Sequence, residues 1–323
     1  MKSKLISLLL VLIIVCMSLS SCARFWLDTG DIRITYEMNN GKSPETLGLG
    51  LTGVMRPQTP TRDGYIFTGW YKDAECTKPY DFDQTPTESM TLYAGWRFDA
   101  EGLMNRFSDD LLKSSVLIRC SFYTTNMFGE KVNNKSVSGS GVIIYEDKDR
   151  YFILTNNHVV INTTNYNTEV YTVYDAFGTS YGASVLHRDS AYDLALMSIR
   201  KGKKKLAVAK LTSSVAPVGT HVLAVGCPDG QINTVTFGKI EKFDSFEMDA
   251  TSTEGNTIEF PVLFHSAPID NGSSGGALFN ESLKLVGINF AATESGGAFK
   301  AGLAVSSDKA REFLRNTTLR LHF

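Results

Sequence analysis

Many short β-strand patterns, separated by turn residues and with no long helical pattern between them, constrain the fold of most of this chain. They fill residues 115–306, and Gly, Asn, Asp or Pro stands in most of the gaps. Strands at this spacing predict an all-β sandwich or barrel. We expect strands at 115–123, 139–145, 151–155, 169–175, 182–187, 194–199, 221–226, 233–242, 259–264, 276–279, 284–291 and 300–305.

Helical segments are expected on both sides of this β-rich region. Before it, apolar residues recur at helix spacing, which predicts a helical connector over 98–114. After it, Ser306, Ser307 and Asp308 form a helix-capping sequence ahead of further apolar positions. We therefore expect a C-terminal helix over 307–315.

The segment before the connector has the pattern of a separate small β-rich module. Residues 32–38 alternate apolar and polar side chains, as in a half-buried strand, and the turn signal Asn39-Asn40-Gly41 follows. Aromatic-rich runs at 65–71 and 91–96 are further strand candidates. A domain of this size needs large side chains to bury enough surface. The side chains expected to fill its core are Trp70, Tyr71, Tyr93 and Trp96.

Residues 1–21 have the features of a bacterial targeting segment. Lys2 and Lys4 precede an apolar run that is short for a membrane-spanning helix, and small residues follow it. The tetrad Leu19-Ser20-Ser21-Cys22 resembles a lipobox, which implies cleavage before Cys22 and attachment of a diacylglycerol to its thiol. Residues 22–30 would then tether the chain to a membrane surface without spanning it. The alternatives are an ordinary secretory signal or an uncleaved anchor.

Composition and charge exclude several classes of protein. Hydrophobic residues make up 43% of the 323 residues, which is enough for a packed core. The formal net charge of −2 gives no electrostatic basis for binding nucleic acid. The cysteines include no C-x-x-C pair and the sequence has no H-E-x-x-H motif, so neither a metal nor a cofactor is predicted. We expect Cys76, Cys120 and Cys227 to be small buried residues rather than disulfide partners.

The segment 271–278, with the sequence NGSSGGAL, carries the strongest catalytic signal. A nucleophilic serine needs an exposed hydroxyl, a nearby base and backbone N–H groups for an oxyanion. Glycines around a serine let the backbone take a tight conformation and let a substrate approach closely. A surface loop of glycine and serine has the same composition, so the prediction depends on a base and a carboxylate elsewhere in the chain.

His158 and Asp193 are the candidates for that base and that carboxylate. His158 follows the hydrophobic run 151–154 and a polar turn, where a rigid strand would hold a base at the edge of a cleft. Asp193 stands at the head of an apolar strand, so we expect it to be buried and to need a partner. A hydrogen bond from His158 Nδ1 would supply one and fix the imidazole tautomer. The remaining histidines are expected to be structural or exposed: His187, His221, His265 and His322.

The order of these residues separates two kinds of serine hydrolase. Residues 272–276 also satisfy G-x-S-x-G, the nucleophile motif of α/β-hydrolases. That fold requires the order Ser, Asp, His and a strand–helix context. Here the order is His158, Asp193, Ser274, and the helices of a parallel sheet are missing. An α/β-hydrolase is therefore excluded.

Four ordered motifs carry a family resemblance: Gly139-Ser140-Gly141, the run from Leu154 to Val160, Asp193-Leu194-Ala195-Leu196, and Gly272-Ser273-Ser274-Gly275-Gly276. They resemble those of trypsin-like serine proteases of the HtrA (Deg) type. The resemblance covers residues 115–315. It implies a mainly β fold of two six-stranded β-barrels, over about 115–204 and 205–306, with the catalytic cleft between them. We expect no PDZ-like domain after residue 315.

The same resemblance implies roles for individual residues. Ser274 would be the nucleophile, His158 the general base and then acid, and Asp193 the carboxylate that orients the imidazole. The N–H groups of Gly272 and Ser274 would form the oxyanion hole. Ser273 is a rival nucleophile, but the family motif places the serine directly before Gly-Gly. The substrate pocket would include Pro268, Asn289, Phe290 and Ala291.

The N-terminal aromatic runs carry a second resemblance. The run from Arg62 to Tyr71, closed by Leu92-Tyr93-Ala94-Gly95-Trp96, resembles the Listeria–Bacteroides (InlB B-type) repeat of bacterial surface proteins. The resemblance covers residues 31–97 and implies a compact β-grasp-like module that acts as a spacer or adhesive unit. A cell-surface ligand of this module therefore stays open as a partner.

Together these features predict a serine endopeptidase that hydrolyses polypeptides through an acyl-enzyme. It would be held on the extracytoplasmic side of the bacterial cell membrane by lipid on Cys22. The alternative is a catalytically latent trypsin-fold protein that serves in surface binding or adhesion, since a fold does not fix a function. The intact triad argues against that alternative, because a binding protein needs none of its members. The sequence leaves the substrate and the oligomeric state open.

Overall fold

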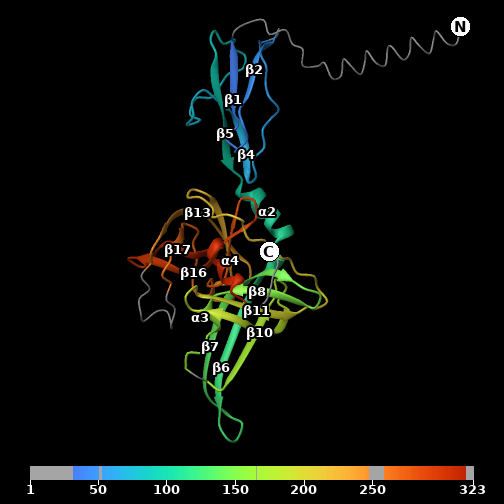
Figure 1. The fold of residues 1–323 in the computed structure, drawn as a ribbon, viewed down its shortest axis with the longest axis vertical. Coiled ribbons are helices and arrows are strands. Elements are labelled where there is room, and N and C mark those ends of the chain that lie inside the picture. The colour runs from blue at the N-terminus through green and yellow to red at the C-terminus, as the bar shows by residue number, and fades with distance from the viewer. Residues whose placement is uncertain (1–31, 51–52, 165, 247–257, 318–323) are drawn as a thin grey trace, which may run out of the picture. The chain divides into compact units, whose positions relative to one another are not determined.

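The chain folds into two compact units, Met1–Asp99 and Ala100–Phe323 (Figure 1). The computed structural model describes residues 32–50, 53–164, 166–246 and 258–317. The expected targeting segment, Cys22 and His322 lie outside the described residues. Within the described part, no helix is both long enough and apolar enough to cross a membrane.

The N-terminal unit is a single mixed β-sheet. Its strands are β1 (Arg33–Glu37), β2 (Glu45–Gly50), β3 (Gly53–Val54), β4 (Tyr65–Tyr71) and β5 (Met90–Phe98). They lie in the order β3-β2-β1-β5-β4. β1 pairs antiparallel with β2 and parallel with β5, so the central pair of strands is parallel. The β-rich character expected of this segment is confirmed.

Aromatic packing fills the core of this sheet only in part as predicted. Trp70 is 7% exposed and packs edge-to-face on Tyr36, with 4.8 Å between ring centroids. Trp96 packs against the same core while partly buried. The expectation for Tyr71 and Tyr93 is wrong, because both lie outside the core at intermediate exposure. Successive residues of a strand point to opposite faces, and each of these tyrosines neighbours a buried residue.

The second unit begins with helices α2 and η1, followed by a closed six-stranded barrel. The barrel order is β10-β11-β8-β7-β6-β9. A short helix, α3, follows the third strand. The elements are α2 (Ala100–Asp110), η1 (Leu112–Ser114), β6 (Ser115–Thr125), β7 (Lys131–Glu146), β8 (Arg150–Thr155), α3 (Asn157–Val160), β9 (Thr168–Tyr174), β10 (Ser180–Asp189) and β11 (Leu194–Arg200).

A second closed six-stranded barrel follows, in the order β12-β13-β14-β17-β16-β15. The helix α4 comes after its last strand, where a C-terminal helix was predicted. The elements are β12 (His221–Gly226), η2 (Pro228–Gly230), β13 (Thr234–Asp244), β14 (Val262–His265), β15 (Ala277–Asn280), β16 (Leu285–Ser295), β17 (Ala298–Ser306) and α4 (Ser307–Arg315).

Strands in both barrels bury both of their faces. In β11, Ala195 and Met197 belong to the core of the first barrel, while Leu194 and Leu196 belong to a core shared by the two barrels and by α2 and α4. β12 divides its residues in the same way between the shared core and the core of the second barrel. This burial explains the continuous apolar runs in these strands, and it fixes the two barrels against each other.

All twelve strands predicted in this unit are present, and the largest difference concerns β7. It begins at Lys131, eight residues before the predicted start at residue 139. Residues 131–138 are mostly polar, so they lack the apolar alternation of a half-buried strand. They are nevertheless paired along β6 in a long hairpin. The connector predicted over 98–114 contains α2 and η1, as expected.

Candidate active site

His158 lies in α3, directly after strand β8. The chain leaves β8 through Asn156, which is completely buried. The Asn156 Nδ2 group donates to the carbonyl oxygen of Asp193 at 2.9 Å, and the Asn157 N–H donates to the same oxygen at 3.1 Å. The pairing of β8 with β11 brings these segments together. The imidazole of His158 is therefore held beside Asp193 by the backbone of two neighbouring strands.

Asp193 binds His158 through both carboxylate oxygens. Its Oδ2 lies 2.7 Å from His158 Nδ1, and its Oδ1 accepts the backbone N–H of His158 at 3.0 Å. The Asp193 side chain is fully buried, and its φ of 48° lies in the left-handed region, which aspartate tolerates better than most residues. A carboxylate can only accept, so Nδ1 carries the hydrogen and Nε2 is left as an acceptor.

Ser274 lies in a tight turn whose glycines are required by contact and by conformation. Gly272 and Gly275 have φ values of +93° and +84°. A Cβ on Gly275 would overlap the carbonyl oxygen of Ser140, and one on Gly276 would overlap a carbonyl oxygen of β12. The Ser140 N–H donates to the Ser274 carbonyl oxygen at 2.7 Å. The turn therefore fits against the first barrel only with glycine at these positions.

His158 and Ser274 line one cavity of about 340 Å³. The Ser274 hydroxyl donates to the carbonyl oxygen of Phe290 at 3.2 Å, across this cavity from α3. The cavity walls are mostly apolar or neutral, with carboxylates from two residues. The other lining residues are Phe246, Ile269, Asp270, Asn271, Ser273, Phe290, Ala291, Ala292 and Glu294.

Backbone hydrogen bonds orient the peptide groups before Ser274. The Asn271 carbonyl oxygen accepts the Asp229 N–H at 3.0 Å, and the Ser273 carbonyl oxygen accepts the Gly276 N–H at 2.9 Å. In a trans peptide the N–H points opposite to the C=O. The N–H groups of Gly272 and Ser274 therefore point away from these acceptors. Neither has a hydrogen-bond acceptor among the described residues.

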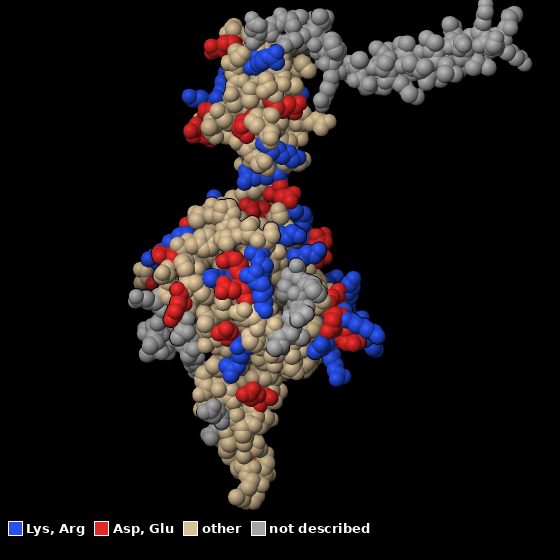
Figure 2. Space-filling model, viewed as in Figure 1, with Lys and Arg blue, Asp and Glu red and all other residues tan. Residues whose placement is uncertain are grey.

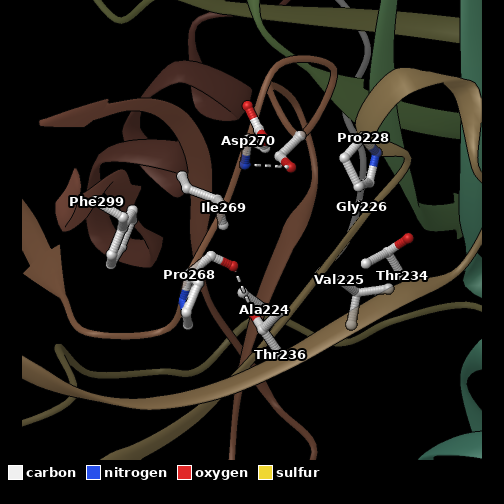
Figure 3. Close-up of a pocket in the computed structure, with 11 residues that line it drawn as sticks. Ala224, Val225, Gly226, Pro228, Thr234, Thr236, Pro268, Ile269, Asp270 and Phe299 are labelled. Atoms are coloured by element: carbon white, nitrogen blue, oxygen red, sulfur yellow. Dashed lines mark hydrogen bonds between the residues drawn. The ribbon is translucent and has the colours of Figure 1, made fainter. Parts of the chain in front are cut away.

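The four predicted pocket residues fall into two groups. Phe290 and Ala291 line the cavity shared by His158 and Ser274. Pro268 instead lines an adjoining cavity of about 280 Å³, where its carbonyl oxygen accepts the Thr236 hydroxyl at 2.7 Å (Figure 3). The Asn289 side chain is buried and its Oδ1 lies 3.1 Å from His265 Nε2. The structure does not bring Pro268 or Asn289 to the cavity of Ser274.

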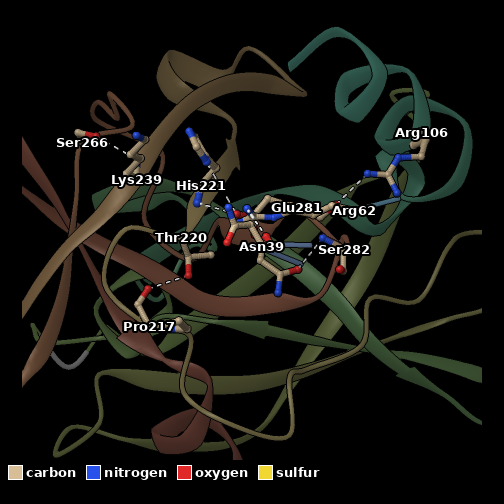
Figure 4. Close-up of polar contacts among 11 residues, drawn as sticks. Asn39, Arg62, Arg106, Pro217, Thr220, His221, Lys239, Ser266, Glu281 and Ser282 are labelled. Atoms are coloured by element: carbon tan, nitrogen blue, oxygen red, sulfur yellow. Dashed lines mark hydrogen bonds and ion pairs between the residues drawn. The ribbon is translucent and has the colours of Figure 1, made fainter. Parts of the chain in front are cut away.

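The other described histidines lie outside the cavity of Ser274, as expected for structural residues. The His187 ring lies 5.3 Å from the Phe313 ring. His221 lies beside Glu281, whose carboxylate accepts the His221 N–H at 3.0 Å (Figure 4). His265 is fully buried, and burial lowers the pKa of its imidazole from 6.5 to about 4.

Sequence reasoning did not assign a role to Ser140, although it lies in the Gly139-Ser140-Gly141 motif. The Ser140 side chain is fully buried. Its hydroxyl donates to the Gly272 carbonyl oxygen at 2.7 Å and accepts the Cys227 N–H at 2.8 Å. Ser140 thus joins the turn of Ser274 to the loop after β12. The serine between two glycines was the signal in the sequence, but its partners are far away in the chain.

The fold and this site define a class of protein. Residues 139–288 match the trypsin-like peptidase domain, and residues 33–95 match the Listeria-Bacteroides repeat domain. The chain therefore combines a trypsin-like peptidase domain with a Listeria–Bacteroides repeat.

Its relatives include proteases of the DegP and HtrA type. The periplasmic serine endoprotease DegP of Escherichia coli is 35% identical over 174 residues, which cover 54% of this chain and 34% of that protein. The serine protease Do-like HtrB of Bacillus subtilis is 36% identical over 172 residues, covering 52% of this chain and 36% of that protein. The chain thus spans about a third of the length of these curated relatives.

Solved structures show the same fold. A mutant, inactive form of Rv3671c from M. tuberculosis has a TM-score of 0.51 at 20% identity, covering 69% of this chain and 97% of that chain. A variant of the HtrA-type protease AlgW with a tripeptide has a TM-score of 0.50 at 28% identity, covering 66% of this chain and 62% of that chain. These likenesses agree with the two closed six-stranded barrels.

Proposed function

We propose that the chain is a serine endopeptidase in which Ser274 is the nucleophile, His158 the general base and Asp193 the group that orients His158. The observation that carries the proposal is the two-point contact between His158 and Asp193, at 2.7 Å and 3.0 Å. This contact leaves Nε2 of His158 as the acceptor, beside a cavity that Ser274 also lines. A base held in this way is what a serine nucleophile needs.

The chemistry follows from these positions. His158 Nε2 takes the hydroxyl proton as Ser274 Oγ attacks the carbonyl carbon of a peptide bond, and then gives that proton to the leaving amine. The oxyanion of the tetrahedral intermediate accepts the unpaired N–H groups of Gly272 and Ser274. Loss of one such donor typically costs about 2.7–4 kcal/mol of transition-state stabilisation. Water activated by His158 then hydrolyses the acyl-enzyme.

Substrate binding would itself prepare the nucleophile. In the resting structure, the Ser274 hydroxyl donates to the Phe290 carbonyl oxygen at 3.2 Å. A substrate strand lying along β16 would offer its own N–H to that oxygen. The Ser274 hydroxyl would then lose its acceptor and turn to His158 Nε2. The enzyme would therefore have its nucleophile activated only when a peptide occupies the cleft.

The same hydrogen bond favours a second candidate function. If the Ser274 hydroxyl stayed on Phe290 when a peptide was bound, the domain would bind polypeptide without cleaving it. This is the latent binding or adhesion protein that the sequence left open.

We further propose that the substrates are polypeptides outside the cytoplasm and that lipid on Cys22 holds the protein on the membrane. Support comes from the lipobox-like tetrad before Cys22 and from the periplasmic assignment of the related DegP. Globomycin-sensitive processing and incorporation of labelled palmitate into the full chain, but not into Cys22→Ala, would be the expected results. Equal labelling of both chains would contradict the anchor.

The test of the enzymatic proposal is covalent labelling of residues 23–323 with a fluorophosphonate probe. We expect an adduct on Ser274 that mass spectrometry locates, and no adduct in Ser274→Ala or His158→Ala. Ser273→Ala is the matched control and should still be labelled, because its neighbour is the nucleophile. Cleavage of an unfolded protein by the wild-type chain, but not by Ser274→Ala, would then establish the endopeptidase. A folded chain that binds the peptide and takes no label would support the latent binding protein.

A further inference from the structure

One edge of β7 is not paired with any strand over much of its length. β7 pairs with β6 from Lys131 to Val142, but it pairs with β8 only from Val142 to Glu146. Among the described residues, no strand lies on the second edge between Lys131 and Gly141. The two long strands of this hairpin extend beyond the rest of the barrel in Figure 1. Such an edge presents unpaired backbone donors and acceptors.

The hydrogen bonds of Ser140 show which backbone groups face this edge. The Ser140 N–H donates to Ser274 at 2.7 Å, and the Ser140 carbonyl oxygen accepts the Thr155 hydroxyl at 2.7 Å. Both groups therefore point away from β6. In an antiparallel ladder, every second residue directs its N–H and C=O to the same edge. The ladder has no register shift between Ser140 and Asn134, so three further residues face the free edge: Ser138, Ser136 and Asn134.

These three residues are accessible and uncharged. The side chains of Ser138, Ser136 and Asn134 are all exposed. Their N–H and C=O groups on the free edge have no backbone partner among the described residues. On the face seen in Figure 2, the tapering end of this unit carries few charged side chains. The edge is therefore suited to a partner that is recognised by its backbone rather than by its charge.

The free edge starts at the candidate nucleophile. Ser140 binds the Ser274 carbonyl, and the next residue facing the same edge is Ser138. The cavity beside Ser274, lined by Phe290 and Ala291, lies on the second barrel and would take the acyl half of a substrate. The half that leaves as the amine must continue past Ser274 on the other side, which is the side of Ser140 and β7.

We propose that the free edge of β7 binds the part of a polypeptide substrate that follows the scissile bond, by adding it as a β-strand. This inference rests on the proposed endopeptidase function and specifies its substrate class. β7 runs towards Ser140, and the leaving half of the substrate runs away from Ser274, so the two strands pair antiparallel. Ser138, Ser136 and Asn134 then bind alternate substrate residues. The bound stretch is about six residues, or roughly 20 Å at the rise of a strand.

Such a site selects extended chains. A folded protein keeps its backbone groups paired within itself, so it cannot offer six extended residues to β7. Small neutral side chains along the edge place little demand on the sequence. The preferred substrate is therefore an unfolded polypeptide cut well before its C-terminus, rather than a short peptide or a chain end.

The experiment compares quenched fluorescent peptides that share one acyl half and carry one to six residues after the scissile bond. We expect kcat/KM to rise with length in steps of two residues, by about three- to tenfold for each step, because each step adds a pair of backbone hydrogen bonds. N-methylation of the longest peptide should lower kcat/KM at alternate amides and have little effect at the amides between them. A value of kcat/KM that does not change with length or with N-methylation would overturn the proposal.

A proline substitution tests the edge from the enzyme side. Ser136→Pro removes an N–H that faces the free edge while leaving the β6 ladder intact, as edge strands allow. Ser136→Ala keeps that N–H and is the matched control. We expect only the proline variant to lose the gain from the longer peptides, with the rate of fluorophosphonate labelling of Ser274 unchanged in both.

That labelling rate separates the two proposals. If the wild-type chain takes no label, the endopeptidase proposal fails and this inference fails with it. If labelling is normal and Ser136→Pro cleaves all peptides as the wild type does, only the β7 site is wrong. If Ser136→Pro instead changes the sedimentation of the protein and leaves cleavage unchanged, the edge pairs with a second copy of the chain and not with substrate.

Discussion

The hydroxyl of Ser140 connects two loops of the candidate active site, and Ser140→Ala removes both of its hydrogen bonds. One joins it to the Gly272 carbonyl oxygen at 2.7 Å, and the other joins it to the Cys227 N–H at 2.8 Å. Alanine fits the same space, because it only deletes the oxygen. The substitution therefore isolates the contribution of these two bonds.

The free energy of unfolding should fall by about 2–4 kcal/mol. Cys227 is completely buried, so its N–H would be left without a partner, which costs about 1–3 kcal/mol. Gly272 is at intermediate exposure, so water can reach its carbonyl and the cost there is about 1 kcal/mol or less. The peptide group of Gly272 would also lose its anchor next to the candidate oxyanion donors.

The rate of fluorophosphonate labelling should fall about tenfold or more. The upper limit is the loss of one complete oxyanion donor, about 2.7–4 kcal/mol, which is on the order of a hundredfold to several hundredfold. Urea unfolding measures the stability, and labelling under conditions where both chains are folded measures the reactivity. Ser138→Ala is the control, because it deletes an exposed hydroxyl two residues earlier in the same strand. A Ser140→Ala chain with the stability and labelling rate of this control would refute the reasoning.

Three further predictions concern separate parts of the molecule. Asp193→Asn should slow labelling of Ser274 by about 10⁴-fold, as measured by probe kinetics, because an amide no longer fixes the tautomer of His158; a loss below tenfold would contradict the role given to Asp193. His265 has a pKa lowered to about 4 by burial. The unfolded chain, with a histidine pKa near 6.5, therefore binds this proton first as the pH falls, and about 3 kcal/mol of stability is lost between pH 6.5 and 4. Urea unfolding at pH 7.5 and 4.5 should show a smaller difference for His265→Gln than for the wild type, and an equal difference would exclude His265 as the cause. Trp70→Ala should destabilise the N-terminal sheet by about 3–5 kcal/mol and lower only one of two calorimetric transitions, with labelling of Ser274 unchanged; a fall in both transitions would show that the units unfold together.

Much of the second unit could be predicted because its signals are local. The apolar runs that became β8, β11 and β12 identify themselves as strands, since each is buried on both faces. His158 and Asp193 stand next to such strands, so their confinement could be expected from neighbouring residues alone. The contact of 2.7 Å between them agrees with the partner predicted for a buried carboxylate.

Other features could not be read from neighbouring residues. The start of β7 is polar, and only its pairing with β6 makes it a strand. Trp70 and Tyr71 are adjacent aromatic residues of one strand, and only the position of the sheet decides that Trp70 is buried and Tyr71 is not. Pro268 was expected beside Ser274, but the turn between them directs it into the adjoining cavity.

The sequence by itself determined which segments become strands and which residue types are available for chemistry, because alternation, turn residues and glycine requirements act over a few neighbouring positions. Tertiary structure decided which of these residues meet. Closure of two barrels brings Ser140 of one against Gly272 and Cys227 of the other, and leaves one edge of β7 unpaired beside Ser274. These contacts depend on the register and direction of whole strands, since hydrogen-bond ladders and packed cores fix positions that no short segment can specify.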